Sequence, residues 1–307
     1  MKRFIKKFPI LVHLYKVVVS HMKASFPYLH AKFAYRVAYG KKCDLKNPKT
    51  LSEKLLWLSL NTYRSNKLVM DLCDKYRVRE FVTERAGEEC LNELYKVYDS
   101  IDSIRFDEMP EHFALKISQG CGTNIICDDK TSYGEDRFYS ELREWKKNQG
   151  VYDKLISNVG GIRKKDLKKY YLCEKLLQEE GKKSPTDYKF YCFSGEPKAI
   201  LVISDRFENK TGLFMNLDWT VLSELSGAYH KPDKVYDRPK ALEQMIETAK
   251  KLSSGFPFVR VDMYDIGGKA IFGEMTFFPN GCIHLQETMI DGKSMGELLD
   301  ISNLQHS

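Results

Sequence analysis

The chain has 307 residues, 43% of them hydrophobic and 30% charged, so it is long enough to bury a full core as an ordinary globular protein. The net charge of +7 is uneven: residues 1–42 hold ten Lys and Arg and no acidic residue, whereas the remainder has 39 basic and 42 acidic residues. This distribution indicates a basic arm on a body that does not bind nucleic acid. The eight cysteines form no C-x-x-C pair, which predicts free thiols in a reducing cytoplasm and no zinc site.

Residues 1–46 are predicted to form a basic amphipathic helical arm. Six apolar residues fall on one helical face, with lysines away from it: Phe4, Ile5, Phe8, Leu11, Val12 and Tyr15. The apolar run 9–19 is interrupted by His13 and Lys16, and it is too short to span a bilayer. Two interpretations stay open. The arm lies on an anionic membrane surface, or it packs on the body or a partner protein with its basic face in water.

Three helices are expected next. The first begins with Thr50 or Ser52 as its N-cap and runs to about Leu60, and the second covers about 66–72. The third opens with Asp74-Lys-Tyr and stops near Gly87.

Residues 113–127 read as a strand, a loop with Gly120 and Gly122, and a second strand. Glycines allow backbone N–H groups to approach an anion, although such a loop alone is commonly just a turn. Lys116 is more informative, because a lysine in an apolar strand is costly without an anionic partner. Its side chain is therefore predicted to reach a phosphate.

Further along, residues 134–168 read as a polar helix with Trp145 in the core, and a strand starts at Tyr170. Residues 181–185 read as a linker, and 187–204 as a hairpin that turns at Ser194-Gly195. Helices are predicted over about 239–253 and 294–299.

The stretch 258–279 carries the most chemistry. Two strand-like runs flank Gly267-Gly268, which predicts an antiparallel hairpin. Arg260 and Asp262 share one face of the first run, and Glu274 shares a face of the second with Thr276. A three-residue loop over 266–268 would set Arg260 opposite Glu274, whereas a two-residue loop would put them on opposite faces.

Two carboxylates about 5 Å apart repel by roughly 3 kcal/mol at an effective dielectric constant near 20, so a cation between them is expected. Arg260 is one candidate, and Mg²⁺, which prefers oxygen ligands, is the other. The alternative is a surface hairpin with an ordinary cross-strand ion pair.

Four segments, in this order, resemble the ATP-grasp superfamily, and most closely its TupA-like branch, named for teichuronopeptide synthesis and found in bacterial surface-polysaccharide loci. They are Asp74-Lys75-Tyr76, the hairpin 113–127, Glu174 with 187–193, and 258–262 with 272–279. The resemblance covers roughly residues 47–301. It implies an α+β fold with a nucleotide between two α+β lobes, the first within 47–180 and the second, with the metal site, within 181–307.

The resemblance also implies roles for single residues. Lys75 and Lys116 look like the two lysines that hold the ATP phosphates, with the phosphate loop over 120–123, including Gly120, Gly122 and Thr123. Glu174 looks like the carboxylate near adenine and ribose, and Asp187 like a second ribose contact. Lys189 is either strand surface or a further phosphate contact.

In the hairpin, Asp262 and Glu274 match the Mg²⁺ carboxylates of the family, and Arg260 matches the arginine that stabilises the transferring phosphoryl group. Thr276 stands where the family usually has an asparagine as third metal ligand, which implies weaker or water-mediated coordination. Two other departures are a shorter phosphate loop and helical residues 1–70 where relatives have a Rossmann-like domain. They leave the acceptor site unassigned.

The implied activity is that of an ATP-dependent ligase that forms an amide bond through an acyl phosphate. It would join an amino acid or amino sugar to a carboxylated glycan or its lipid-linked precursor, in the cytoplasm or at the inner face of the cytoplasmic membrane. A glycosyltransferase that holds a metal-bound sugar nucleotide is one alternative, and a non-catalytic ATP-binding module is another.

Overall fold

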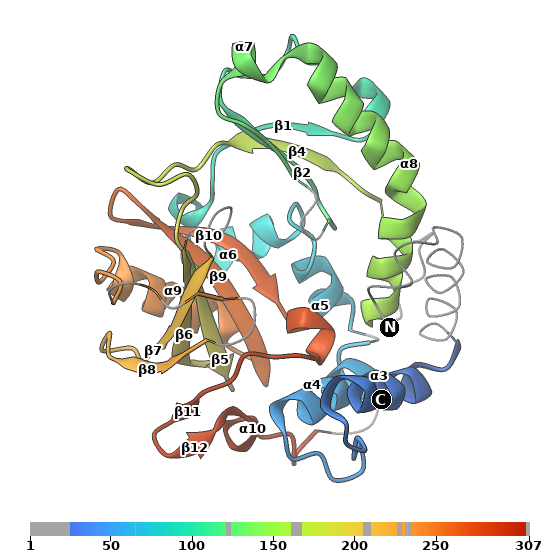
Figure 1. Cartoon of the computed structure of the whole chain (residues 1–307), viewed down its shortest axis with the longest axis vertical. Coiled ribbons are helices and arrows are strands. Elements are labelled where there is room, and N and C mark those ends of the chain that lie inside the picture. Colours follow the sequence, from blue (N-terminus) through green and yellow to red (C-terminus); the bar gives the residue numbers. More distant parts are fainter. Residues whose placement is uncertain are drawn as a thin grey trace.

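The structure is a computed structural model that describes residues 25–64, 66–120, 124–160, 168–204, 210–225, 229–230, 232 and 235–304, with the side chains of α8 described as far as residue 147. It contains helices and two large antiparallel sheets, which confirms the predicted α+β class (Figure 1). The apolar face predicted for residues 4–15 lies outside the described residues. None of the described helices is long and apolar enough to cross a membrane. The described cysteines are all free.

The N-terminal helices begin close to where their caps predict. After α3 (Pro27–Tyr39), α4 (Leu51–Asn61) starts at a capping box in which Thr50 and Glu53 bind each other's backbone N–H groups. Asn66 caps α5 (Lys67–Leu72), and α6 (Val78–Ala86) ends at Gly87. A short 3-10 turn, η1 (Glu88–Cys90), leads to the first strand.

The smaller sheet has the strand order β1-β4-β2-β3. Its strands are β1 (Leu94–Tyr98), β2 (Phe113–Ile117), β3 (Asn124–Cys127) and β4 (Tyr171–Lys175). Between them lie η2 (Ile101–Ser103), α7 (Lys130–Tyr133) and the long helix α8 (Glu135–Gly160). Phe138, Leu142 and Trp145 on α8 pack in one core with Phe113 and Leu115 of β2, so this helix covers one face of the sheet (Figure 1).

The larger sheet has six strands in the order β10-β9-β5-β6-β7-β8. They are β5 (Asp187–Phe193), β6 (Glu196–Ser204), β7 (Thr211–Met215), β8 (Val221–Glu224), β9 (Phe258–Ile266) and β10 (Lys269–Thr276). Ser194 and Gly195 both have positive φ, as a tight two-residue hairpin requires, which confirms the predicted turn.

Side-chain alternation gives the larger sheet two different faces. Val259, Val261 and Met263 are fully buried in the same core as helix α9 (Leu242–Ser253), which contacts β5, β6 and β9. Arg260 and Asp262, at the alternate positions of β9, therefore point to the opposite face. That face looks toward the smaller sheet.

Helices α4, α5 and α6 share their hydrophobic core with the larger sheet and not with the smaller one. The predicted division at residues 46 and 180 stays a prediction, but packing connects these helices to the lobe of residues 187–276. Lys75 lies just before α6 and therefore belongs to the part of the chain that packs on the larger sheet.

The chain ends in η4 (Pro279–Cys282), a small hairpin of β11 (Met289–Ile290) and β12 (Lys293–Ser294), and α10 (Met295–Leu298). The last helix packs on the start of α4 at Gly296. A Cβ atom there would lie 2.5 Å from the carbonyl oxygen of Lys49 and 2.9 Å from the backbone nitrogen of Leu51.

Gly296→Ala is therefore expected to lower the free energy of unfolding by about 1–3 kcal/mol, because the backbone of α4 must move. Urea denaturation measures this change. Lys293→Ala, on an exposed neighbour, should stay within about 0.5 kcal/mol of the unchanged protein. Equal stability of the two variants would contradict the close packing of α10 on α4.

Candidate functional site

The β9–β10 hairpin determines which side chains meet, and its turn differs from the three-residue loop considered above. The loop has two residues, Gly267 and Gly268. On its own, this loop would place Glu274 opposite Val261 and on the wrong face. A β-bulge at Gly273 shifts the register by one residue and returns Glu274 to the face of the site.

The bulge also corrects the predicted pairing. Glu274 lies opposite Asp262, and Arg260 lies opposite Thr276 rather than opposite Glu274. Gly273 suits this position because a Cβ atom there would lie 3.0 Å from the carbonyl oxygen of Asp262. A residue without a side chain lets the two strands approach at the bulge.

The third strand, β5, extends the same two rows. Lys189 pairs with Asp262, and Tyr191 pairs with Arg260. One row across the sheet therefore reads Lys189, Asp262, Glu274. Backbone pairing alone brings a cation and two acids from three separate segments into line.

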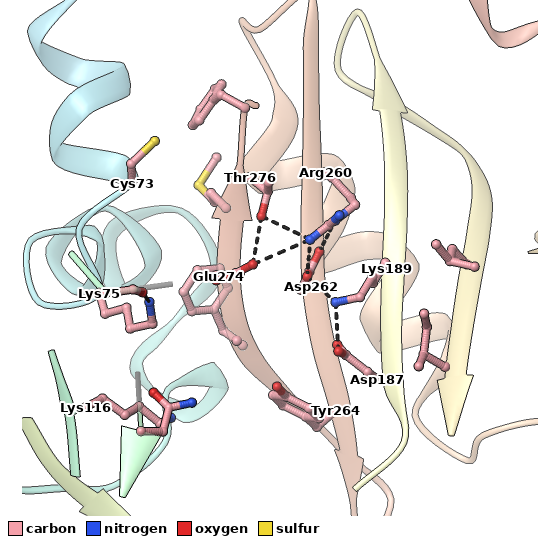
Figure 2. Close-up of a pocket in the computed structure, with 18 of the residues that line it drawn as sticks. Cys73, Lys75, Lys116, Asp187, Lys189, Arg260, Asp262, Tyr264, Glu274 and Thr276 are labelled. Carbon is pink, nitrogen blue, oxygen red and sulfur yellow. Dashed lines mark hydrogen bonds and ion pairs between the residues drawn. The ribbon is translucent and has the colours of Figure 1, made fainter. Parts of the chain in front are cut away.

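Ion pairs connect these side chains. Arg260 donates to both carboxylate oxygens of Asp262, from Nε at 2.6 Å and from Nη2 at 2.7 Å, and its Nη2 lies 3.5 Å from Glu274 Oε1. The Lys189 ammonium lies 2.5 Å from Asp262 and 2.7 Å from Asp187 (Figure 2). Asp262 is 2% exposed, so a buried carboxylate lies between two cationic partners.

Thr276 positions the cluster through its hydroxyl group. Its Oγ1 donates to Glu274 at 2.9 Å and accepts from Arg260 Nη2 at 3.3 Å. The first contact orients Glu274, and the second connects Thr276 to Arg260. Its assignment as a metal ligand stays a prediction.

The charges around Glu274 favour its ionised form. Burial acts to raise the pKa of Glu274, but Lys75, Arg260 and Lys189 together lower it to about 2. Burial likewise opposes the charge of Arg260, yet the adjacent Asp262 carboxylate raises the pKa of its guanidinium. Both groups therefore stay charged throughout the neutral range.

This shift predicts an acid-sensitive contribution to stability. Because the pKa of Glu274 in the folded chain lies below the ordinary 4.5, its stabilisation is present above about pH 4.5 and is lost as the pH falls toward 2. In thermal unfolding, the unchanged protein should be more stable than Glu274→Gln above about pH 4.5, and this difference should shrink as the pH falls toward 2. Parallel pH profiles for the two proteins would contradict the assignment.

The residues on β5, β9 and β10 form one wall of the site, and the opposite wall begins at the turn before α6. Asp74 is buried and accepts from the backbone N–H groups of Tyr76 and Arg77 and from the Ser118 hydroxyl. These bonds hold the turn that presents Lys75, whose Nζ donates to the Gly120 carbonyl at 2.6 Å. The Asp-Lys-Tyr segment is thereby connected to the end of the lysine strand.

Lys116 projects from β2 on this same wall. Its ammonium lies 2.7 Å from Glu174 Oε2, and Arg79 lies 3.7 Å from the other carboxylate oxygen. Ala114 pairs with Glu174, so Lys116, two residues farther on, shares its face of the sheet. The anionic partner that Lys116 requires is thus present within the chain.

Both walls enclose one cavity of about 660 Å³. In Figure 2, Lys75 and Lys116 face the Asp262–Glu274 cluster across it. It is lined by every predicted site residue that the structure describes: Lys75, Lys116, Gly120, Glu174, Asp187, Lys189, Arg260, Asp262, Glu274 and Thr276. Gly122 and Thr123 lie outside the described residues, and all these assigned roles stay predictions.

Sequence reasoning missed several polar residues that line the cavity, among them Cys73, Arg79 and Lys210. Arg79 follows Lys75 by four positions, a helical spacing that was the available signal. Lys210 comes from a different part of the chain and donates to the Tyr229 hydroxyl at 3.1 Å. No local pattern marks it.

The donor set fits Mg²⁺. Asp262 and Glu274 supply carboxylate oxygens from directly paired positions on adjacent strands. Mg²⁺ commonly takes only one or two protein carboxylates and completes its shell with phosphates and water. Among the described residues no group of three or more His, Cys, Asp and Glu is placed to hold a metal ion.

Comparison with known proteins gives the following matches. The solved structure of D-alanine–D-alanine ligase from Bacillus anthracis with ATP is similar, with 14% identity and a TM-score of 0.38 over 68% of this chain and 57% of that one. The ATP-grasp ligase PsnB with minimal precursor, Mg and ADP has 14% identity and a TM-score of 0.37 over 74% of this chain and 58% of that one. N5-carboxyaminoimidazole ribonucleotide synthetase from Thermotoga maritima has 12% identity and a TM-score of 0.37 over 70% of this chain and 44% of that one. This chain spans less than two thirds of each. No curated protein sequence matches it. The family described as TupA-like ATPgrasp matches residues 53–299, which is most of the chain. The expected fold is thereby confirmed, and the chain belongs to the TupA-like ATP-grasp family.

Proposed function

We propose that the protein is an ATP-dependent carboxylate–amine ligase that modifies a bacterial surface polysaccharide or its lipid-linked precursor. The observation that carries the proposal is the cavity itself: lysines of one wall face an arginine and paired carboxylates on the other. A volume of about 660 Å³ falls in the range of small-molecule and cofactor pockets. Membership of the ATP-grasp family supports ATP as the ligand.

The nucleotide would lie across the two walls. Lys75 and Lys116 would hold its phosphates, while Glu174 and Asp187 would accept from adenine and ribose. Asp187 is buried beside Lys189, so the hydroxyl groups of a ribose there would meet a fixed acceptor. Lys116 would reach a phosphate by leaving, or by sharing, its contact with Glu174.

Asp262 and Glu274 would hold Mg²⁺, which when bound neutralises the negative charge of the phosphates. Arg260 already spans both acids, and its fork of N–H donors suits the equatorial oxygens of a phosphoryl group in transfer. Fixed charges in a recess need no reorganisation during the reaction. Positioning and electrostatics would supply most of the rate.

The reaction balances in two steps. A substrate carboxylate oxygen attacks the γ-phosphorus of ATP, which forms an acyl phosphate and releases ADP. An amine then attacks the acyl carbon, the C–O bond to phosphate breaks, and the amine loses a proton as the amide forms. Neither step requires an enzyme nucleophile.

The substrates are proposed by class. The amine would come from an amino acid or amino sugar, and the carboxylate from a uronic-acid-type unit of the glycan. Membership of the TupA-like family supports this choice of substrates.

Product analysis tests the proposal. Purified protein is incubated with Mg-ATP, a pool of amino acids and amino sugars, and oligosaccharides with uronic acid units, and the products are examined by mass spectrometry. We expect a new mass equal to the sum of two substrates less water, formed only with ATP and accompanied by ADP. Transfer from UDP-sugars without ATP would replace the proposal with a glycosyltransferase. Stabilisation by Mg-ATP without ADP release across the panel would indicate a binding module.

A further inference from the structure

Helix α3 presents an apolar stripe to the solvent. Phe26, just before the helix, and Leu29, Phe33 and Val37 on it are 61%, 59%, 54% and 66% exposed. At 100° per residue Leu29, Phe33 and Val37 fall within about 80° of one another, on one side of the helix and over about 12 Å of its length, and Phe26 precedes them at the N-cap. Side chains that share one face in this way form a continuous surface rather than scattered exposures.

The opposite side of α3 is fixed to the body. Ala31 and Tyr35 are buried, the Tyr39 hydroxyl lies 2.7 Å from Ser52 Oγ, and Tyr28 donates to Asn61 at 2.7 Å. Both hydroxyl contacts reach α4, beside which α3 lies at the edge of the molecule (Figure 1). The stripe therefore lies on a helix whose inner side already packs on the body of the protein.

Basic residues lie beside the stripe and beyond its end. Lys32 and Arg36 are exposed along one flank, and Lys41 and Lys42 follow the helix end at Gly40. The first acidic residue of the whole chain is Asp44. An apolar stripe with basic residues along one flank has the composition of a helix that lies in the headgroup region of a membrane.

We propose that this face of α3 docks on an anionic lipid surface, with Phe33 and Val37 entering the acyl boundary and Lys32 and Arg36 contacting the headgroups. The size of the face favours lipid over a protein partner. These four side chains cover less than the roughly 800 Å² that each partner buries in a stable protein interface. Such a stripe together with juxtamembrane charge is enough for reversible lipid binding.

Vesicle flotation with the full chain tests the proposal and does not depend on the ligase reaction. We expect binding to vesicles of phosphatidylcholine with phosphatidylglycerol, loss of binding at high salt, and little binding to phosphatidylcholine alone. The charge variant Lys32→Gln/Arg36→Gln should bind roughly 25-fold more weakly, at about fivefold for each basic residue. The apolar variant Phe33→Ser/Val37→Ser should bind at least about tenfold more weakly.

Two control variants carry matched changes elsewhere on the surface. Lys198→Gln/Lys269→Gln removes two exposed charges from strands of the larger sheet, and Val235→Ser/Met289→Ser removes two exposed apolar side chains. Both should bind vesicles as the unchanged protein does. Thermal unfolding checks that all four variants fold.

Three results would overturn the proposal. One is vesicle binding that neither α3 variant weakens, and another is equal binding with and without phosphatidylglycerol. The third is dimerisation in light scattering that Phe33→Ser/Val37→Ser abolishes, which would make a second copy the occupant of the stripe.

Discussion

Replacing Glu274 with glutamine is expected to abolish ATP turnover and leave the fold intact. The amide keeps the shape of the side chain and its contact with Thr276, but it removes one of the two negative charges that would hold the metal. Loss of several kcal/mol of charge stabilisation corresponds to a fall in kcat of at least about 100-fold.

ADP release with the substrate panel measures this loss, and titration calorimetry with Mg-AMPPNP measures the change in nucleotide affinity without any acceptor. Glu247→Gln, an exposed change on α9, is the matched control and should behave as the unchanged protein. A Glu274→Gln protein with full turnover and unchanged affinity would remove this residue from the metal site.

Replacing Arg260 with methionine should damage stability as well as activity. Asp262 is buried and would keep Lys189 as a partner, but it would lose the bidentate contact from Arg260. Removing one partner of a buried ion pair costs up to about 3–5 kcal/mol, because the remaining charge is poorly compensated. Turnover should fall too, since no other group spans both acids in this way among the described residues.

A double-mutant cycle separates the two effects. Adding Asp262→Asn to Arg260→Met should recover part of the lost stability but none of the activity, with a coupling energy of about 1–3 kcal/mol between the two sites. Arg260→Lys should recover stability better than turnover, because a point charge cannot reproduce the fork of the guanidinium. Additive losses in the cycle would show that the pair does not act as a unit.

Local signals predicted the parts of the fold that depend on local chemistry. Thr50 and Glu53 mark a capping box, and Ser194-Gly195 matches a tight turn, so both elements lie where the sequence places them. The four motifs that resemble the ATP-grasp superfamily also predicted which residues would meet. The described ones line a single cavity although they come from five strands, the loop after β2 and a turn before α6.

The register of β9 and β10 was beyond local prediction. A two-residue loop and a three-residue loop fit Gly267-Gly268 equally well as sequence, and neither alone gives the observed pairing. The deciding feature is the bulge at Gly273, which depends on how closely its backbone approaches Asp262. Lys210 was missed for the related reason that tertiary packing, not spacing along the chain, brings it to the cavity.

Anomalous diffraction from crystals grown with Mn²⁺ and AMPPNP tests most directly whether this cavity binds a metal-bound nucleotide. We predict one strong peak about 2.0–2.3 Å from carboxylate oxygens of both Asp262 and Glu274, with triphosphate density running from it toward Lys75 and Lys116. A metal peak away from these two acids, or a nucleotide bound outside the cavity, would contradict the account.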